Sequence, residues 1–274
     1  MTHRSLHRSL VLPVAAALAL TAVAPSSVPA QPAPAKKPLD PRAQAIADVV
    51  TANHILADQG VVDGFGHVSI RDPSDPNKFF LARSMAPELV TSADVLEHDL
   101  DGNAPSAGSA KLYLERFIHA EIYRARPDVN AIVHCHSPDL IPFGATGIAL
   151  RPLYHMSSFL GGGVPVFDIH KAANGSTDML VKSPDLGKAL AKALGPHPAA
   201  LMRGHGAVVV GKDVQSAVFR SVYTELNAKL QAQAMTLGAK VIYLDADEAK
   251  KSEETNGALV GRSWELWVRK VRDR

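Results

Sequence analysis

A helix that runs directly into a short apolar strand constrains the fold of this chain more than any other feature of its sequence. Residues 115–125 carry apolar side chains at helical spacing, and the Arg-Pro-Asp turn at 126–128 ends this helix. Residues 131–136, which read Ala-Ile-Val-His-Cys-His, follow at once as a strand. Helices that alternate with strands in this way indicate an α/β sheet covered by helices, and they argue against a helical bundle or a β-barrel.

The same patterns recur along the rest of the chain. Apolar residues at helical spacing predict further helices over 41–59, 186–194 and 214–237. Short apolar runs bounded by turn residues predict strands over 66–71, 78–82, 95–100, 164–167, 200–202 and 206–210. The first two of these strands flank the turn cluster 72–77 and are expected to form a hairpin. We therefore predict one folded α/β domain over residues 41–274.

The first forty residues are predicted to lie outside that domain. Arg4 and Arg8 precede an apolar run over residues 10–23, and the small residues Val-Pro-Ala at 28–30 suit cleavage by signal peptidase. This pattern predicts a signal peptide over 1–30, a flexible linker over 31–40, and an exported protein that is periplasmic or secreted. The apolar run is shorter than the ~20 residues that a membrane-spanning helix needs, so no membrane span is expected.

Charge and cysteine content narrow the classes of partner. The formal net charge is only +2, and the basic residues are scattered among acidic ones, which argues against a nucleic-acid partner. Cys135 is the sole cysteine, so an internal disulfide is impossible. An exported chain of this kind would be stabilised by packing and by association between subunits.

The His-Cys-His sequence at 134–136 is the most informative chemical feature. Side chains alternate between the two faces of a strand, so residues i and i+2 project from the same face about 7 Å apart. His134 and His136 can therefore approach one ion together, while Cys135 points to the opposite face. Imidazole nitrogens bind zinc and similar metals at ~2.0 to 2.1 Å, and a catalytic site needs a third ligand from elsewhere in the chain.

His205 is the candidate for that third ligand. It lies between Gly204 and Gly206 at the end of a hydrophobic strand, and glycines on both sides let the backbone approach a site closely. A lone histidine is more often a hydrogen-bonded core or surface residue, but three histidines in these settings favour a metal site. Glu115, at the start of the preceding helix, is interpreted as a fourth ligand or a proton-transfer base, although without further context it reads as a solvated glutamate.

The segment over residues 115–138 closely resembles the class II aldolase/adducin family, and the resemblance extends over about residues 42–237. It implies a single domain with a central, mostly antiparallel or mixed sheet between layers of helices. It also implies that His134, His136 and His205 bind a divalent metal ion and that Glu115 is the catalytic residue. Adducin-type members lack the metal histidines, so their presence in this chain argues for catalysis.

The resemblance also implies a homotetramer with sites at subunit interfaces, where a residue of a neighbouring chain such as Tyr243 would complete the pocket. The metal is a separate question: zinc, manganese, iron and cobalt all accept imidazole ligands, so the residues leave the native metal open, with zinc and manganese placed first.

Three departures from the family's sugar-phosphate aldolases indicate a substrate without a phosphate group. His67 replaces an asparagine, Arg83 and Ser84 stand in place of a small-residue turn, and Tyr113 with Leu114 replaces a serine pair. A phosphate cradle needs close backbone amides and small hydroxyl residues, which these bulky side chains do not provide. Arginine pairs well with a carboxylate, so we expect a carboxylated small molecule. The residues predicted to bind it are His67, Ser69, Arg83, Ser84 and Tyr154.

The resulting interpretation is a metal-dependent carbon–carbon lyase that acts on a carboxylated, hydroxylated small molecule. The Gly-His-Val-Ser sequence at 66–69 resembles the family branch that includes decarboxylases of hydroxylated pyridine or benzene dicarboxylates, yet decarboxylation and aldol cleavage both stay open. One alternative is a non-haem iron oxygenase on the same scaffold. Another is a non-catalytic, adducin-like metal-binding or interaction protein, which the presence of Glu115 argues against.

The C-terminal part contains two different patterns. Residues 245–257 are strongly charged and are expected to be mobile. Trp264 and Trp267 give the last segment an apolar character, and we expect them to pack within the chain rather than to bind a partner.

Overall fold

The structure is a computed structural model that describes residue 1 and residues 39–272 of the chain. Its α-helices are α1 (Pro41–Asp58), α2 (Arg116–Ala125), α3 (Ile141–Ala145), α4 (Ile169–Ala172), α5 (Pro184–Leu194), α6 (Val214–Thr236), α7 (Ala246–Gly257) and α8 (Val260–Arg272). Its strands are β1 (His67–Arg71), β2 (Lys78–Ala82), β3 (Val95–Asp99), β4 (Ala131–Cys135), β5 (Val166–Phe167), β6 (Ala199–Met202) and β7 (Gly206–Gly211). Four short 3-10 segments are η1 (Pro87–Leu89), η2 (Ser92–Asp94), η3 (Pro105–Ala107) and η4 (His155–Gly162).

Seven strands form one mixed sheet in the order β3-β2-β1-β4-β7-β6-β5. Neighbouring strands are antiparallel except for β5 and β6, which run parallel. The predicted hairpin is present, since β1 and β2 pair with Ile70 opposite Phe80. The prediction of a single α/β domain with a mostly antiparallel, mixed sheet between helices is confirmed.

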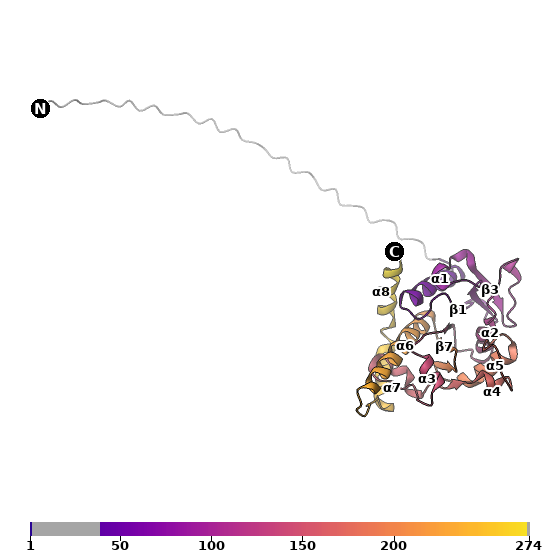
Figure 1. Ribbon diagram of the computed structural model, residues 1–274. Helices are drawn as coiled ribbons and strands as arrows, with labels where there is room; N and C mark the ends of the chain where they lie inside the picture. The colour runs from indigo at the N-terminus through magenta and orange to yellow at the C-terminus, as the bar shows by residue number, and fades with distance from the viewer. Residues whose placement is uncertain (2–38, 273–274) are drawn as a thin grey trace. The chain divides into compact units, whose positions relative to one another are not determined.

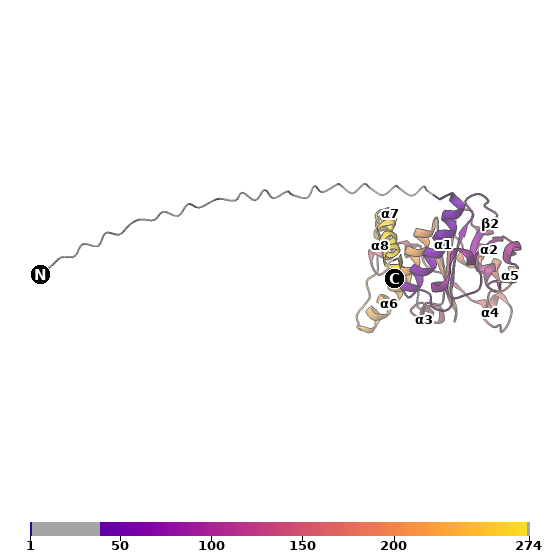
Figure 2. The same ribbon diagram turned by 90° about the horizontal axis from the view of Figure 1, so that it is seen from above.

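Helices cover both faces of this sheet, as the two views in Figures 1 and 2 show. Helices α1 and α6 pack on one face, against strand residues such as Val133 and Val209, and α8 packs on these two helices. Helices α2 and α5 pack on the other face, against Ile132 and Val208. Successive strand residues point to opposite faces, so the continuous apolar runs of β4 and β7 contribute to both cores.

Strand β4 lies in the middle of the sheet and carries the first candidate metal ligand. His134 lies opposite His67 of β1 and opposite Val208 of β7. Cys135 is buried among the core residues beneath α1 and α6, whereas His134 faces Glu115 at the start of α2. The two side chains therefore point to opposite faces, as predicted.

Two predicted segments differ from the structure. The strand expected over 164–167 is limited to β5, which pairs only with β6 at the edge of the sheet. Residues 246–257, expected to be mobile, form α7 instead. Asp245 and Glu248 make a capping box at its start, and Asn256 near its end donates a hydrogen bond to the carbonyl of His155 in η4. Local capping and packing on η4 thus order a segment whose composition alone indicated mobility.

The last helix, α8, packs within the chain as expected. Trp267 is buried, and its ring centroid lies 6.3 Å from that of Tyr223 in α6.

The predictions for the N-terminal segment need a correction. Residues 2–38 lie outside the described residues, which include only 39 and 40 of the predicted linker over 31–40. The prediction of a signal peptide over 1–30 and of export to the periplasm is withdrawn, because nothing in the described part of the chain indicates either of them. Within that part, no helix combines the length and the apolar character needed to cross a membrane.

Gly206, the first residue of β7, lets this strand approach β4 closely. A Cβ atom at this position would lie 2.0 Å from the carbonyl oxygen of Cys135, so a side chain cannot fit unless one strand moves. We expect Gly206→Ala to lower the free energy of unfolding of the metal-free protein by ~1 to 3 kcal/mol, measured by urea denaturation. Gly147→Ala is the control, because nothing lies within 4 Å of its added Cβ. Equal stability of the two variants would contradict the packing argument.

Candidate metal centre and substrate pocket

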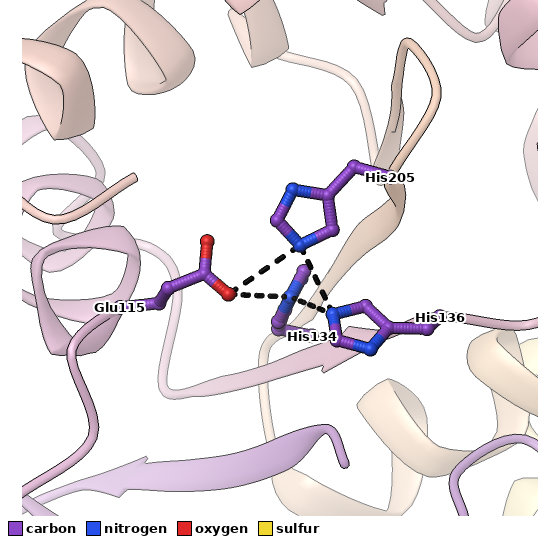
Figure 3. A group of neighbouring side chains, drawn as sticks. All are labelled: Glu115, His134, His136 and His205. Atoms are coloured by element: carbon purple, nitrogen blue, oxygen red, sulfur yellow. Dashed lines mark hydrogen bonds and ion pairs between the residues drawn. The ribbon is translucent and has the colours of Figure 1, made fainter. Parts of the chain in front are cut away.

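Two strand ends and one helix start bring four polar side chains together. His134 lies in β4, and His136 lies one residue beyond its end. His205 lies in the turn between β6 and β7, where Gly204 has a φ of +65°, a conformation that glycine adopts most readily. Glu115 is the N-cap residue of α2. Figure 3 shows its carboxylate and the three imidazoles pointing toward one centre.

The atoms that face this centre are spaced as metal ligands are. The Nε2 atom of His136 lies 3.1 Å from Nε2 of His134 and 3.0 Å from Nε2 of His205. Oε2 of Glu115 lies 3.3 Å from Nε2 of His134 and 3.4 Å from Nε2 of His205. Ligand atoms about 2.0 to 2.1 Å from a tetrahedral zinc ion lie ~3.3 Å from one another. The four residues therefore fit a divalent metal ion.

Hydrogen bonds to backbone carbonyls orient two of the imidazoles. Nδ1 of His134 donates to the carbonyl of Ala207 at 3.0 Å, and Nδ1 of His205 donates to that of Met179 at 2.8 Å. A carbonyl oxygen only accepts, so the proton of each neutral ring lies on Nδ1. Nε2 of His134 and of His205 is left with the lone pair that a metal requires.

The loop between α4 and α5 supplies two backbone groups to the same centre. Met179 has a φ of +67°, which is uncommon for a residue with a side chain, and its carbonyl is the acceptor for His205. Two residues later, the amide of Val181 donates to Oε1 of Glu115 at 2.9 Å. This bond holds the carboxylate so that Oε2 faces the histidines.

Burial and neighbouring charges decide which of these groups carry protons. Burial opposes the ionisation of Glu115, but His134 and His205 outweigh it and hold the pKa of this carboxyl well below its usual value. Burial, His134 and His205 together lower the pKa of His136 to about 4, so its ring is neutral near pH 7. In the metal-free protein burial lowers the pKa of His205, but the hydrogen bond from its Nε2 proton to Glu115 and the charge of Glu115 outweigh it, and the net shift is upward. A bound metal ion would displace this Nε2 proton and use the lone pair. The ionised Glu115 can bind a metal or accept a proton.

A pocket of about 380 Å³ opens beside the cluster, within the ~300 to 1,000 Å³ typical of small-molecule sites. Glu115 and His136 line it, together with two of the residues predicted to bind substrate, His67 and Ser84. The rest of its wall is largely apolar and consists of Gly64, Phe65, Gly66, Met85, Ala86, Tyr113, Leu114 and Leu180. A wall of this kind suits a flat, apolar ring.

The structure places the other residues predicted to bind substrate outside this pocket lining. Arg83 forms a salt bridge with Asp94, with 2.7 Å between Nε and Oδ1, so its charge already has a partner. Tyr154 lies beside Tyr223 of α6, with ring centroids 6.5 Å apart. Ser69 is fully buried in β1, and its hydroxyl bonds to side chains of α2.

His119 is a buried polar residue of this region that sequence reasoning missed. It lies behind His67, with 2.7 Å between its Nε2 and Nδ1 of His67. The spacing of Glu115, His119 and Tyr123 carried the signal, because residues four apart share one face of a helix. Burial and the neighbouring histidines lower the pKa of His67 and of His119 well below the usual value, so both rings are neutral.

The chain matches known proteins over most of its length. Residues 47–232 match the family described as class II aldolase and adducin N-terminal domain. The decarboxylase tropJ of Talaromyces stipitatus is 37% identical over 244 residues, which cover 81% of this chain and 92% of that protein. A 3,4-dihydroxyphthalate decarboxylase of Arthrobacter keyseri is 29% identical over 218 residues, which cover 74% of this chain and 84% of that protein.

A solved structure shares the fold. L-fuculose 1-phosphate aldolase from Glaciozyma antarctica superposes with a TM-score of 0.70 and 23% sequence identity, over 85% of this chain and 90% of that one. At this level of identity the similarity concerns the fold alone.

The geometry of the cluster predicts a loss of metal binding when one imidazole is removed. We expect His205→Ala to lower the affinity for zinc by more than ~100-fold, because only two of the three imidazole ligands remain. Isothermal titration of the metal-free protein with zinc measures this. His170→Ala, which removes an exposed histidine of α4, is the control and should bind zinc as the wild type does. Wild-type affinity in His205→Ala would rule out a role as ligand.

Proposed function

Because this chain belongs to the class II aldolase and adducin family, we propose that it is a metal-dependent decarboxylase of a hydroxylated aromatic carboxylate. The observation that carries the proposal is the cluster of Glu115 and three histidines beside a largely apolar pocket. The prediction of a carbon–carbon lyase of this family is confirmed by the match to decarboxylases over most of the chain. The substrate class, the set of metal ligands and the identity of the metal are the parts that we propose.

We assign His134, His136 and His205 as metal ligands, with Glu115 facing the same ion. The imidazole set suits zinc, manganese, iron and cobalt, and the near-tetrahedral spacing supports zinc first and manganese second. The bound ion would supply a Lewis acid that stabilises negative charge on substrate oxygens.

The pocket suits a carboxylated ring better than a sugar phosphate. The hydroxyl of Tyr113 donates to the carbonyl of Met85, and the tyrosine ring lies 4.4 Å from that of His67, so a bulky group fills the place of a phosphate cradle. The amide of Ser84 donates to the carbonyl of Lys111 at 2.8 Å and is not available to a phosphate oxygen. His67 remains as the polar group that contacts the substrate carboxylate.

The residues of this chain account for the proton transfers of a decarboxylation. Ionised Glu115 accepts the proton of a ring hydroxyl next to the carboxylate and transfers it to the ring carbon that bears the carboxylate. The bond between that carbon and the carboxylate then breaks, carbon dioxide leaves, and its electron pair returns to the ring. The product is a phenolate that takes up a proton from solvent, and Glu115 is again ionised.

We expect the zinc-loaded protein to release carbon dioxide from hydroxylated aromatic carboxylates, with 3,4-dihydroxyphthalate, the compound named for the Arthrobacter keyseri relative, as the first probe. A coupled assay for carbon dioxide measures the reaction, and an oxygen electrode should record no oxygen uptake. Uptake of oxygen during turnover would support the iron oxygenase instead. Cleavage of hydroxy-aldehydes without carbon dioxide release would support an aldolase, and metal binding without any turnover would support an adducin-like binding protein.

Glu115→Gln tests the proton transfers separately from metal binding. The amide keeps the shape of the carboxylate but cannot accept the hydroxyl proton, so kcat should fall by ~10² to 10⁴-fold. Zinc titration should still show one bound ion, since the three imidazoles remain. Glu254→Gln, which alters an exposed glutamate of α7, is the control and should keep wild-type kcat. Full activity of Glu115→Gln would exclude the proposed role.

We also propose a homotetramer with the pocket near a subunit boundary. Phe65 and Leu114 of the pocket wall are 68% and 58% exposed, and an apolar rim of this kind suits a neighbouring subunit. Tyr243, the candidate contribution from a neighbour, packs against Arg151 in its own chain, with 4.3 Å between the guanidinium carbon and the ring centroid. Light scattering of the purified protein is expected to give about four times the mass of one chain. The mass of a single chain would contradict this proposal.

A further inference from the structure

A row of hydrogen bonds connects the pocket to the layer between β1 and α2. Nδ1 of His67 lies 2.7 Å from Nε2 of His119, and Nδ1 of His119 lies 2.6 Å from Oγ of Ser69. Oγ of Ser69 lies 2.8 Å from the hydroxyl of Tyr123. These four side chains are at most 4% exposed, so they bond to one another rather than to bulk water.

The regular structure explains why they meet. His67 and Ser69 are two residues apart on β1 and project from the same face of the sheet. His119 and Tyr123 are four residues apart on α2, the helix that covers this face, and so share one side of the helix. The contacts are therefore fixed by the packing of α2 on the sheet.

The protons in this row can be placed by counting donors and acceptors. A neutral imidazole has one N–H and one lone pair, so His119 must donate from one ring nitrogen and accept at the other. Burial raises the pKa of Tyr123 well above its usual value, so this hydroxyl keeps its proton and needs an acceptor for it. A buried hydroxyl whose proton finds no acceptor suffers the full cost of desolvation.

Only one arrangement gives both hydroxyl protons an acceptor within the row. Tyr123 donates to Ser69, Ser69 donates to Nδ1 of His119, and Nε2 of His119 donates to Nδ1 of His67. With the reverse polarity, the Tyr123 proton has no acceptor among the described residues. If Tyr123 and His119 both donated to Ser69, the hydroxyl proton of Ser69 would have no acceptor in the row. The favoured polarity leaves the proton of His67 on Nε2.

Building on the proposed function, we propose that Ser69 and His119 are positioning residues that fix His67 as a neutral hydrogen-bond donor, through Nε2, to an oxygen of the substrate. His67 lines the pocket beside Glu115 and His136. Among the described residues, no hydrogen bond engages Nε2 of His67. An N–H at this position recognises the lone pair of a carboxylate or of an ionised hydroxyl.

The same polarity keeps His67 out of the metal site. Its ring centroid lies 5.0 Å from that of His134, so His67 is close enough to be considered as a further ligand of the same metal ion. A metal binds an imidazole nitrogen through its lone pair, and in the favoured tautomer the pocket-facing nitrogen of His67 carries a proton instead. In this tautomer His67 can donate a hydrogen bond to the substrate but cannot bind the metal ion.

Magic-angle-spinning NMR of the zinc-loaded protein, labelled with ¹⁵N in histidine, tests the tautomer directly. Protonated and unprotonated ring nitrogens resonate far apart, and loss of signals in His67→Asn identifies those of His67. We expect the proton on Nε2 in the wild type. We expect the same in His119→Gln, whose amide can donate to His67 and accept from Ser69, and a mixture of tautomers in His119→Phe. A wild-type proton on Nδ1 of His67 would overturn the proposal whether or not the protein is active.

Steady-state kinetics with 3,4-dihydroxyphthalate test the consequence for the substrate. His119→Phe should raise KM by about ten-fold or more and change kcat by less than about threefold, because the contact from His67 is made both before and during the reaction. His119→Gln should restore KM to within about threefold of the wild type.

His98→Phe is the matched control for His119→Phe. His98 is fully buried and stacks on Phe79 as His119 does, but it does not belong to the row of hydrogen bonds. Its kinetic constants should stay within about threefold of the wild type. Similar constants for the two phenylalanine variants would show that His119 only packs, and the proposal would fail. If the wild type releases no carbon dioxide, the proposed function fails, while the NMR result still decides the tautomer.

Discussion

The pairing of β4 between β1 and β7 is the constraint on which the rest of the site depends. It sets His134 opposite His67 on one side and next to the start of β7 on the other, so the turn that carries His205 is close to His136. Gly206 makes this approach possible, because any side chain there would meet the backbone of β4. Ladder hydrogen bonds on both sides of β4 hold its backbone in register, so the backbone of His134 cannot shift unless its pairing with β1 and β7 is broken.

Helix α2 adds the second half of the site by the same kind of constraint. Its start presents Glu115 to the histidines, and its next turns place His119 and Tyr123 behind β1. Carbonyl acceptors keep the ring protons of His134 and His205 on Nδ1, so their lone pairs face the cluster. In the proposed arrangement the hydroxyl of Ser69 acts through His119 on the neighbouring His67, which then faces the pocket with an N–H group instead. Residues of one type thus acquire different chemistry from the partners behind them, which no count of histidines reveals.

The sequence predicted what periodicity and local spacing determine. The helix before β4, the hairpin of β1 and β2 and the opposite orientations of His134 and Cys135 all follow from apolar patterns that report which side is buried. The lyase family followed from the resemblance that the segment joining Glu115 to His136 carries, and the family model confirms it. Contacts between segments that are distant in the sequence could not be predicted from local patterns. The residues next to Arg83 in the sequence, for example, do not indicate that Asp94 forms a salt bridge with it. His119 was hidden inside an ordinary helical stripe, and α7 was misread because composition does not show what a segment packs against.

The loop between α4 and α5 holds the cluster through two main-chain hydrogen bonds, by the carbonyl of Met179 and the amide of Val181. Leu180 lies between these two anchors and lines the pocket. Main-chain groups are the same for nearly every amino acid, so a different residue at position 180 can reshape the cavity while the bonds to Glu115 and His205 stay the same. The shape of the cavity and the positions of Glu115 and His205 are in this way separable within three consecutive residues.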